Sequence, residues 1–166
     1  MAAVTWARLG QDRWPWSLSL PWLGGAYEAR LAASLGLGLA VAALVVATTP
    51  WLVRRVTWAR ALQEELRPII ADLSSAEIAF LALASGLAEE LFFRGAMQPA
   101  LGLLTTSLIF GVVHTGPKRV FLWWAAWAFA MGLVFGAIFE ATGVLWGAVL
   151  AHALINQRNM MFMKGH

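Results

Sequence analysis

Long apolar stretches that lack charged residues constrain the fold of this chain more than any other feature. One of them runs from Leu31 to Val53 without a charged residue and is closed by Arg54 and Arg55. A helix crosses the hydrocarbon core of a bilayer with about 20 predominantly apolar residues. The stretch is long enough for this, so it predicts a membrane-spanning helix.

The composition extends this interpretation to the whole chain. Of the 166 residues, 60% are hydrophobic and only 13% are charged, whereas a soluble domain carries about 25% charged residues. The length suits a single bundle of roughly five spans of about 20 residues each, joined by short loops. The predicted fold class is therefore all-α, a multi-pass transmembrane helical bundle of about five spanning helices plus interfacial helices.

Start and stop signals bound the remaining spans. Ser74 or Ser75 followed by Glu77 offers a helix start, and the sequence Thr115-Gly116-Pro117 is a stop. The four further spans are expected over residues 76–99, 100–114, 120–139 and 144–157.

Two segments outside the expected spans have a different character. Residues 57–72 interleave charged and apolar residues, which predicts an amphipathic helix at the interface, broken at Pro68. Residues 1–29 mix Trp, Arg, Pro and Gly with short apolar pieces. This pattern indicates either a segment lying at the membrane surface or a poorly ordered tail.

The basic residues indicate how the bundle is oriented. The net charge is +3, but Lys and Arg fall singly or in pairs beside the apolar segments, which argues against nucleic-acid binding. Five spans would put the 54–75 loop, the 115–119 loop and the carboxyl terminus on one side, and most basic residues lie there. The positive-inside tendency then predicts an amino terminus outside and a cytoplasmic carboxyl terminus.

Missing residues and motifs exclude several kinds of chemistry. The chain has no cysteine, which excludes disulfides, thiolate metal sites and a thiol nucleophile. It has no H-E-x-x-H sequence, so a standard zincin helix is absent. It also lacks a G-x-S-x-G elbow, which disfavours a serine nucleophile although Ser85 and Ser107 are present.

Two adjacent glutamates interrupt the second expected span. A charge near the centre of a membrane helix costs roughly 2.5 to 3.5 kcal/mol, so Glu89, Glu90 and Arg94 need a use. Glu90 precedes Arg94 by four residues, the favourable order for an ion pair on a helix. Glu89 is turned about 100° away and remains free, so it is a candidate general base. A solvated helix end with a salt bridge is the alternative.

Two further groups of polar residues, containing histidine and asparagine, lie in otherwise apolar stretches. His114 ends the third expected span, with Phe110 one turn earlier, and His152 lies four residues before Asn156. Taken alone, His114 suits an interfacial position, and His152 with Asn156 suits an interhelical hydrogen bond worth about 1 kcal/mol. Taken together with Glu89, they offer a carboxylate, two imidazoles and a carboxamide, which can activate a water and stabilise an oxyanion.

Three sequences in this order resemble a known family. Glu89-Glu90-Leu-Phe-Phe-Arg94, Phe110-Gly-Val-Val-His114 and His152-Ala-Leu-Ile-Asn156 are similar to motifs of the CAAX protease and bacteriocin-processing (ABI) family of intramembrane endopeptidases. The resemblance covers residues 83–159. We therefore divide the chain into residues 1–75, with the interfacial segment, first span and connector, and residues 76–166, with the expected catalytic core.

The resemblance implies a role for each motif position. Glu89 would activate water as general base, with His114 helping to hold that water. His152 and Asn156 would line the oxyanion site. The supporting residues would be Glu90, Arg94 and Phe110. No cofactor is expected, although Glu89, His114 and His152 could in principle ligate zinc.

The resemblance also implies a class of activity and partners. The chain is expected to hydrolyse a peptide bond of a membrane-anchored protein or peptide, as a CAAX-type or bacterial processing enzyme in the bacterial inner membrane. Its partners would be the substrate, the lipid bilayer and further membrane subunits. The alternative is a non-catalytic immunity factor or complex subunit that uses the polar cluster for packing or partner binding. A proton-relay transporter is a third reading.

Overall fold

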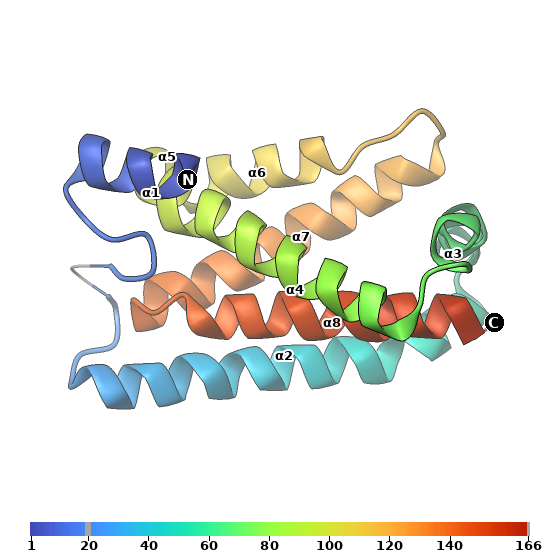
Figure 1. Ribbon diagram of the computed structural model, residues 1–166, viewed down its shortest axis with the longest axis horizontal. Coiled ribbons are helices and arrows are strands. Elements are labelled where there is room, and N and C mark those ends of the chain that lie inside the picture. The colour runs from blue at the N-terminus through green and yellow to red at the C-terminus, as the bar shows by residue number, and fades with distance from the viewer. Residues whose placement is uncertain (19–20, 166) are drawn as a thin grey trace.

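The computed structural model describes residues 1–18 and 21–165, and over this part of the chain the fold is an all-α bundle (Figure 1). Two short elements, α1 (Ala2–Thr5) and the π-helix η1 (Trp6–Gly10), begin the chain. The bundle is then built from α2 (Tyr27–Arg55), α3 (Thr57–Ile70), α4 (Ser75–Glu90), the π-helix η2 (Leu91–Met97), α5 (Gln98–Leu101), α6 (Leu103–Val113), α7 (Val120–Thr142) and α8 (Trp146–Gly165).

Helices α2, α8 and α4 form one group, and α6 packs along α7 (Figure 1). Small residues let α2 and α8 approach closely. A methyl group added at Gly38 would lie 2.1 Å from the Gly147 carbonyl oxygen. Ser34 completes the contact, because its hydroxyl donates to the Val144 carbonyl at 2.7 Å and accepts from the Gly147 N–H at 3.0 Å. Close packing of small residues is a general means of holding membrane helices together.

Each expected span is helical, although residues 76–99 are divided among α4, η2 and α5, and fewer helices than expected are long and apolar enough to cross a membrane alone. Among the described residues, α2 and α7 are long and apolar enough, and a third candidate arises if α3 and residues 75–101, bent by 114°, count as one span. The 11 residues of α6 extend only about 16 Å. Helix α8 falls short because polar residues such as His152, Asn156 and Arg158 lie within it. By length and composition alone, the described residues therefore give two or three candidate spans, against the roughly five expected.

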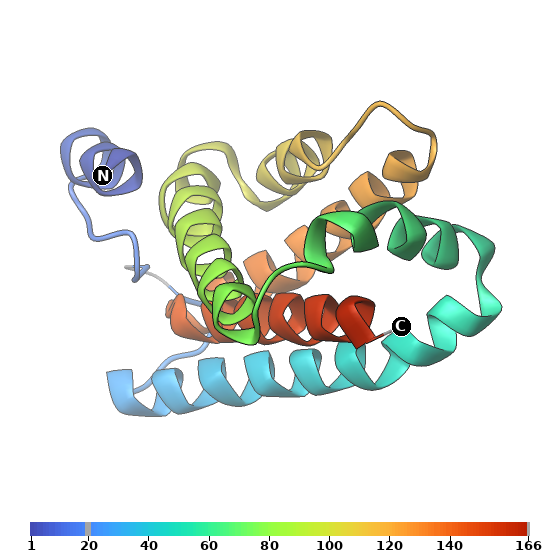
Figure 2. The ribbon, with the colours of Figure 1, turned by 45° about the vertical axis from the view of Figure 1, so that its right-hand side comes forward.

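The amphipathic connector, expected over residues 57–72, is the helix α3 over Thr57–Ile70. The expected break at Pro68 is wrong, since the helix continues to Ile70. Pro68 has no N–H to offer the Glu64 carbonyl, and the helix ends two residues after it. Figure 2 shows α3 lying across one end of the bundle between the end of α2 and the start of α4.

That end of the bundle also holds the 115–119 loop and the end of α8 (Figure 1). Lys118 Nζ contacts Glu65 of α3 at 2.7 Å, and Lys164 donates to the carbonyl of Leu73. Trp58 of α3 stacks on Trp123 of α7 with ring centroids 5.9 Å apart. The three segments that the sequence analysis grouped on one side therefore lie together.

The amino-terminal segment is helical and packs on η2. Ala3 and Ala7 are buried, and the Trp6 ring meets Phe92 edge to face at 6.2 Å. Further along, Leu18 N–H donates to the Gly143 carbonyl at 3.0 Å, which fastens the segment to the turn between α7 and α8. Positions 19 and 20 of the predicted surface segment lie outside the described residues. The described part is therefore ordered against the bundle, unlike a poorly ordered tail, and its position at a membrane surface stays a prediction.

Candidate active site

Helix α4 carries the glutamates and starts where the sequence indicated. Ser74 is its N-cap: its hydroxyl accepts from the Glu77 N–H at 3.2 Å, while the Glu77 carboxylate accepts from the Ser74 N–H at 2.7 Å. This reciprocal capping box fixes the start of the helix. Glu89 and Glu90 lie at its other end, in its last turn.

The helix changes register directly after the glutamates, because residues Leu91–Met97 form a π-helix. Such segments are rare and occur frequently at functional sites. Pro99 follows and has no N–H to offer the Gly95 carbonyl. Arg13 donates to that carbonyl instead, and the Gln11 side chain donates to the Ala96 carbonyl at 2.8 Å. The amino-terminal segment thus donates hydrogen bonds to two backbone carbonyls of the π-helix η2.

Glu90 is the centre of a buried ionic network. Its Oε1 accepts from Arg94 Nη1 at 3.0 Å and from His152 Nδ1 at 2.8 Å. The side chains of Glu90 and Arg94 are 0% and 1% exposed. Because a carboxylate beside a guanidinium only accepts, His152 carries a proton on Nδ1 and donates it. The network joins α4 and η2 to α8.

Aromatic rings surround the buried guanidinium of Arg94. Its central carbon lies 4.2 Å from the ring centroid of Phe110 and 5.6 Å from that of Phe135. Arg94 Nε and Nη2 have no hydrogen-bond partner among the described residues. Cation–π attraction is worth about 2 kcal/mol when desolvated, so the rings stabilise a charge that has only one hydrogen bond.

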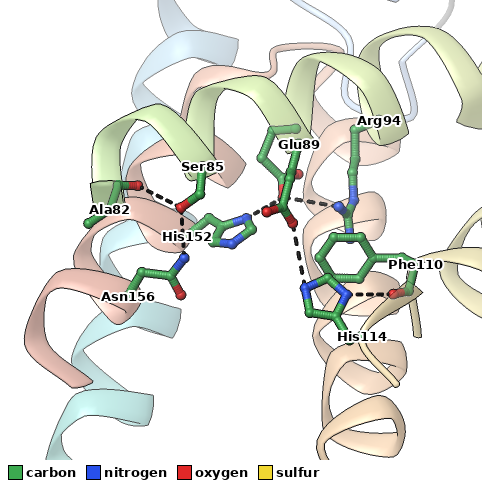
Figure 3. Close-up of polar contacts among 9 residues, drawn as sticks. Ala82, Ser85, Glu89, Arg94, Phe110, His114, His152 and Asn156 are labelled. Atoms are coloured by element: carbon green, nitrogen blue, oxygen red, sulfur yellow. Dashed lines mark hydrogen bonds and ion pairs between the residues drawn. The ribbon is translucent and has the colours of Figure 1, made fainter. Parts of the chain in front are cut away.

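Glu89 faces His114 across the site (Figure 3). The carboxylate Oε2 lies 3.6 Å from His114 Nε2, and its side chain is 31% exposed. His114 Nδ1 lies 2.7 Å from the Phe110 carbonyl oxygen, which can only accept. Nδ1 therefore donates, and Nε2 is the nitrogen presented to Glu89. The His114 ring is held by Phe110 on the same helix and by Trp124 of α7, at centroid distances of 4.5 Å and 5.4 Å.

Asn156 of α8 is held by a hydrogen bond to Ser85 of α4. Its Nδ2 donates to Ser85 Oγ at 3.1 Å, and Ser85 in turn donates to the Ala82 carbonyl at 3.3 Å (Figure 3). Since Ser85 lies one turn before Glu89 on α4, the two side chains share a helix face. Asn156 lies one turn after His152 on α8.

These side chains surround a single cavity of about 450 Å³. It is lined by Glu89, Phe93, Val113, His114, Thr115, Trp124, His152 and Asn156. The structure thus brings together the four side chains that the sequence analysis selected, from α4, α8 and the end of α6. Glu90 and Arg94 lie behind it and are buried.

A second cavity of about 450 Å³ adjoins the first and is mainly apolar. It shares His114, Trp124, His152 and Asn156 with the polar cavity, and α3 contributes Trp58, Leu62 and Leu66 to its wall. Helices α7 and α8 contribute aromatic and methionine side chains, among them Trp127, Met131, Phe135, Met160 and Met163. An apolar compartment therefore meets the polar site at three of its functional groups.

The sequence matches the type II CAAX prenyl endopeptidase Rce1-like family over residues 72–157. The chain belongs to this family. The matched region contains all the side chains of the polar cavity, and it includes the Glu90–Arg94 pair. The amino-terminal segment, α2 and α3 lie outside it.

One curated relative and the solved structures complete the comparison. The chain is 34% identical over 95 residues to "Uncharacterized protein YpbD" of Bacillus subtilis (strain 168). The match covers 54% of this chain and 47% of the relative, so the chain spans about half the length of that protein. No solved structure matches the chain. Membership of the Rce1-like family supports an endopeptidase of the CAAX kind in a membrane.

Sequence reasoning missed two features of the Rce1-like site. It paired Glu90 with Arg94 alone, whereas His152 shares the same carboxylate oxygen. It considered Ser85 only as a nucleophile, whereas Ser85 holds Asn156. The four-residue spacing of Ser85 and Glu89 was the available signal for a shared face.

The same histidines bear on the zinc alternative. Among the described residues, no group of three or more His, Cys, Asp or Glu side chains is arranged to hold a metal ion. His152 Nδ1 is engaged by Glu90, and Glu89 faces only one imidazole. Among the described residues, Glu89, His114 and His152 are therefore not grouped as three ligands of one ion.

Proposed function

We propose that the chain is an intramembrane glutamate-type endopeptidase that hydrolyses a peptide bond of a membrane-associated protein through an activated water. One observation carries the proposal: Glu89, His114, His152 and Asn156, from distant parts of the sequence, line one cavity. This set supplies an acceptor for a water proton and donors for an oxyanion, the two requirements of amide hydrolysis.

Glu89 and His114 form the water-activating half. Glu89 Oε2 is buried and has no hydrogen-bond partner among the described residues, so its acceptor capacity is unused. His114 Nε2 faces it at 3.6 Å and is fixed by the bond from Nδ1 to Phe110. A water held by the two groups would pass a proton to Glu89 as its oxygen attacks the substrate carbonyl carbon.

His152 and Asn156 form the oxyanion half. When the water oxygen bonds to the carbonyl carbon, the C=O π electrons move to the carbonyl oxygen, which becomes negative. Asn156 keeps one N–H beyond the bond to Ser85, and His152, held by Glu90 through Nδ1, places its ring at the wall of the same cavity. Donors fixed before the charge develops stabilise it without reorganisation.

The second half of the reaction returns the proton. The tetrahedral intermediate collapses, the carbonyl re-forms and the C–N bond breaks. Glu89 delivers the proton it took from water to the leaving nitrogen, so a carboxylic acid and an amine are released. Glu89 thus acts first as base and then as acid and ends unchanged.

The adjoining apolar cavity supports a substrate with a hydrophobic part next to the cleaved bond. It meets the polar cavity at His114, His152 and Asn156. A CAAX-type chain end or a bacterial membrane-anchored protein suits this arrangement. The proposed setting is the bacterial inner membrane, with the amino terminus outside and the carboxyl terminus cytoplasmic, and other membrane subunits as partners.

Cleavage of reporter peptides by the purified protein in detergent tests the proposal. One reporter carries a prenylated CAAX end and the other an unprenylated apolar anchor, each with a fluorophore and quencher flanking the bond. The wild type should cleave at least one reporter. Glu89→Ala and His114→Ala should each abolish cleavage while the protein stays folded and inserted. Full activity of purified Glu89→Ala protein would overturn the proposal.

Two further measurements separate the competing interpretations. Treatment with a strong chelator should leave the rate unchanged, because the proposed water activation uses no metal. A non-catalytic subunit would instead show no cleavage by the wild type, and the same alanine variants would lose thermal stability or partner association. Comparing melting temperature and cleavage rate on the same preparations distinguishes the two functions.

A further inference from the structure

The hydroxyl of Ser85 lies between two helices at the junction of the two cavities. Ser85 lines the apolar cavity, and its hydrogen-bond partner Asn156 lines both. The two bonds of the hydroxyl run to Ala82 on its own helix, at 3.3 Å, and to Asn156 on α8, at 3.1 Å (Figure 3).

The proton count of a hydroxyl fixes the direction of both bonds. Serine has one proton to donate, and the Ala82 carbonyl can only accept, so the proton goes to Ala82. The oxygen of Ser85 then offers only lone pairs toward α8. A side chain that meets it there must donate, which selects the Nδ2 end of the Asn156 carboxamide over the Oδ1 end.

This selection matters for the chemistry of Asn156. A carboxamide that turned by 180° about its last bond would bring Oδ1 to Ser85, and two acceptors would then face each other. Ser85 could relieve this only by giving up Ala82. With Nδ2 held, one of its two protons is used and the other stays available to a substrate oxygen.

Helix α4 packs so closely on α8 that the short side chain of Ser85 reaches Asn156. Gly86 adjoins Ser85, and a methyl group added there would lie 3.0 Å from the backbone nitrogen of Ala153. The two backbones are therefore almost in contact beside the hydrogen bond. Because of this approach, a serine side chain spans the gap to Asn156 without a longer residue.

We propose that Ser85 is a positioning residue of the peptidase reaction: it orients the Asn156 carboxamide so that one N–H is free to stabilise the oxyanion. This inference rests on the proposed function. Ser85 touches neither the attacked carbon nor the leaving group, and it acts only through Asn156.

A double-mutant cycle on the cleavage rate tests the inference. A neutral hydrogen bond is worth about a factor of ten, so Ser85→Ala should lower kcat about tenfold and leave KM nearly unchanged. Ser85→Cys, which keeps the size but accepts weakly, should show a similar loss. Ser85→Thr keeps the hydroxyl and should retain most of the activity. In an Asn156→Ala background, Ser85→Ala should add no further loss.

Ser34→Ala is the matched control. Ser34 also joins two helices through a buried hydroxyl, but it contacts Val144 and Gly147, away from both cavities. Its loss should lower the melting temperature with kcat unchanged. Ser85→Cys covers the case in which Ser85→Ala fails to fold.

Three results would overturn the inference and are distinguishable. If kcat is unchanged in Ser85→Ala and Ser85→Cys but lowered in Asn156→Ala, the positioning role of Ser85 is rejected and the proposed function stands. A loss that multiplies with that of Asn156→Ala shows that Ser85 acts on another group. Absence of cleavage by the wild type removes the inference together with the proposed function.

Discussion

His152 Nδ1 lies 2.8 Å from Glu90 Oε1, the same oxygen that accepts from Arg94 at 3.0 Å. The second glutamate of the motif, at the end of α4, is therefore shared between a cation on η2 and an imidazole on α8. One carboxylate fixes the tautomer and the orientation of His152, and it also offsets the charge of Arg94.

Glu90→Gln should destabilise the folded protein by about 3 kcal/mol, because removing one partner of a buried ion pair leaves the other charge uncompensated. Arg94, whose side chain is 1% exposed, would then have a neutral amide in place of its carboxylate partner. Thermal or denaturant unfolding in detergent measures the effect. Glu64→Gln, at an exposed position on α3, should change stability by less than about 0.5 kcal/mol. Equal stability of the two variants would contradict the assignment.

The sequence predicts local pairs better than distant ones, and this network shows why. The Glu90–Arg94 pair follows from a spacing of four residues on one helix. His152 is 62 positions from Glu90, and its partner depends on how α8 crosses α4. No spacing rule supplies that crossing. The convergence of the four cavity residues could be inferred only because several costly polar groups needed partners in a small bundle.

The contact of α2 with α8 makes a second prediction. Gly147→Ala would put a methyl group 1.9 Å from the Ser34 carbonyl oxygen, a backbone atom that cannot move aside alone. We expect a loss of about 3 kcal/mol or failure to fold, since overpacking forces the helices apart. Gly36→Ala is the control on α2: nothing lies within 4 Å of its added methyl group, so its stability should equal or slightly exceed that of the wild type. Comparing the unfolding midpoints of the two variants tests this prediction.

The backbone irregularities were beyond sequence reasoning, although their causes can be seen afterwards. A regular helix was expected through Arg94, whereas residues 91–97 are a π-helix. Pro99 marks the region, but its missing N–H does not reveal which side chain replaces it. The partner, Arg13, comes from a segment for which the sequence left two alternatives. Helix bounds were easier to predict: the span expected over residues 100–114 is the short helix α6 (Leu103–Val113).

Arg13 provides a third prediction. Its guanidinium donates to the Gly95 carbonyl, to the Ser17 carbonyl at 2.9 Å and to Gln11 Oε1 at 2.9 Å. Burial lowers the pKa of Arg13 from its ordinary value, yet arginine stays charged at neutral pH. Arg13→Ala should cost about 2 kcal/mol, because it leaves several acceptors unsatisfied. Arg13→Lys should not restore the loss, since an ammonium lacks the fork that reaches all three groups.

Arg8→Ala is the control for Arg13. Arg8 lies on the same segment but forms an exposed pair with Asp12 at 3.7 Å, which is worth about 0.5 kcal/mol. The two variants are compared by unfolding midpoint and by proteolysis of residues 1–18. If Arg13→Ala behaves like Arg8→Ala, the amino-terminal segment does not stabilise the π-helix.

Glu89 and Glu90 should give opposite phenotypes although they are neighbours. Glu89 is 31% exposed and its Oε2 has no hydrogen-bond donor among the described residues, whereas Glu90 is 0% exposed and has two donors. Glu89→Gln should therefore leave the unfolding midpoint nearly unchanged and lower the cleavage rate at least about 100-fold, the usual contribution of a general base. Glu90→Gln should lower the midpoint as well as the rate. Measuring midpoint and initial rate on the same preparations tests this division. If Glu89→Gln destabilises as strongly as Glu90→Gln, Glu89 is a structural residue and the water-activating role falls.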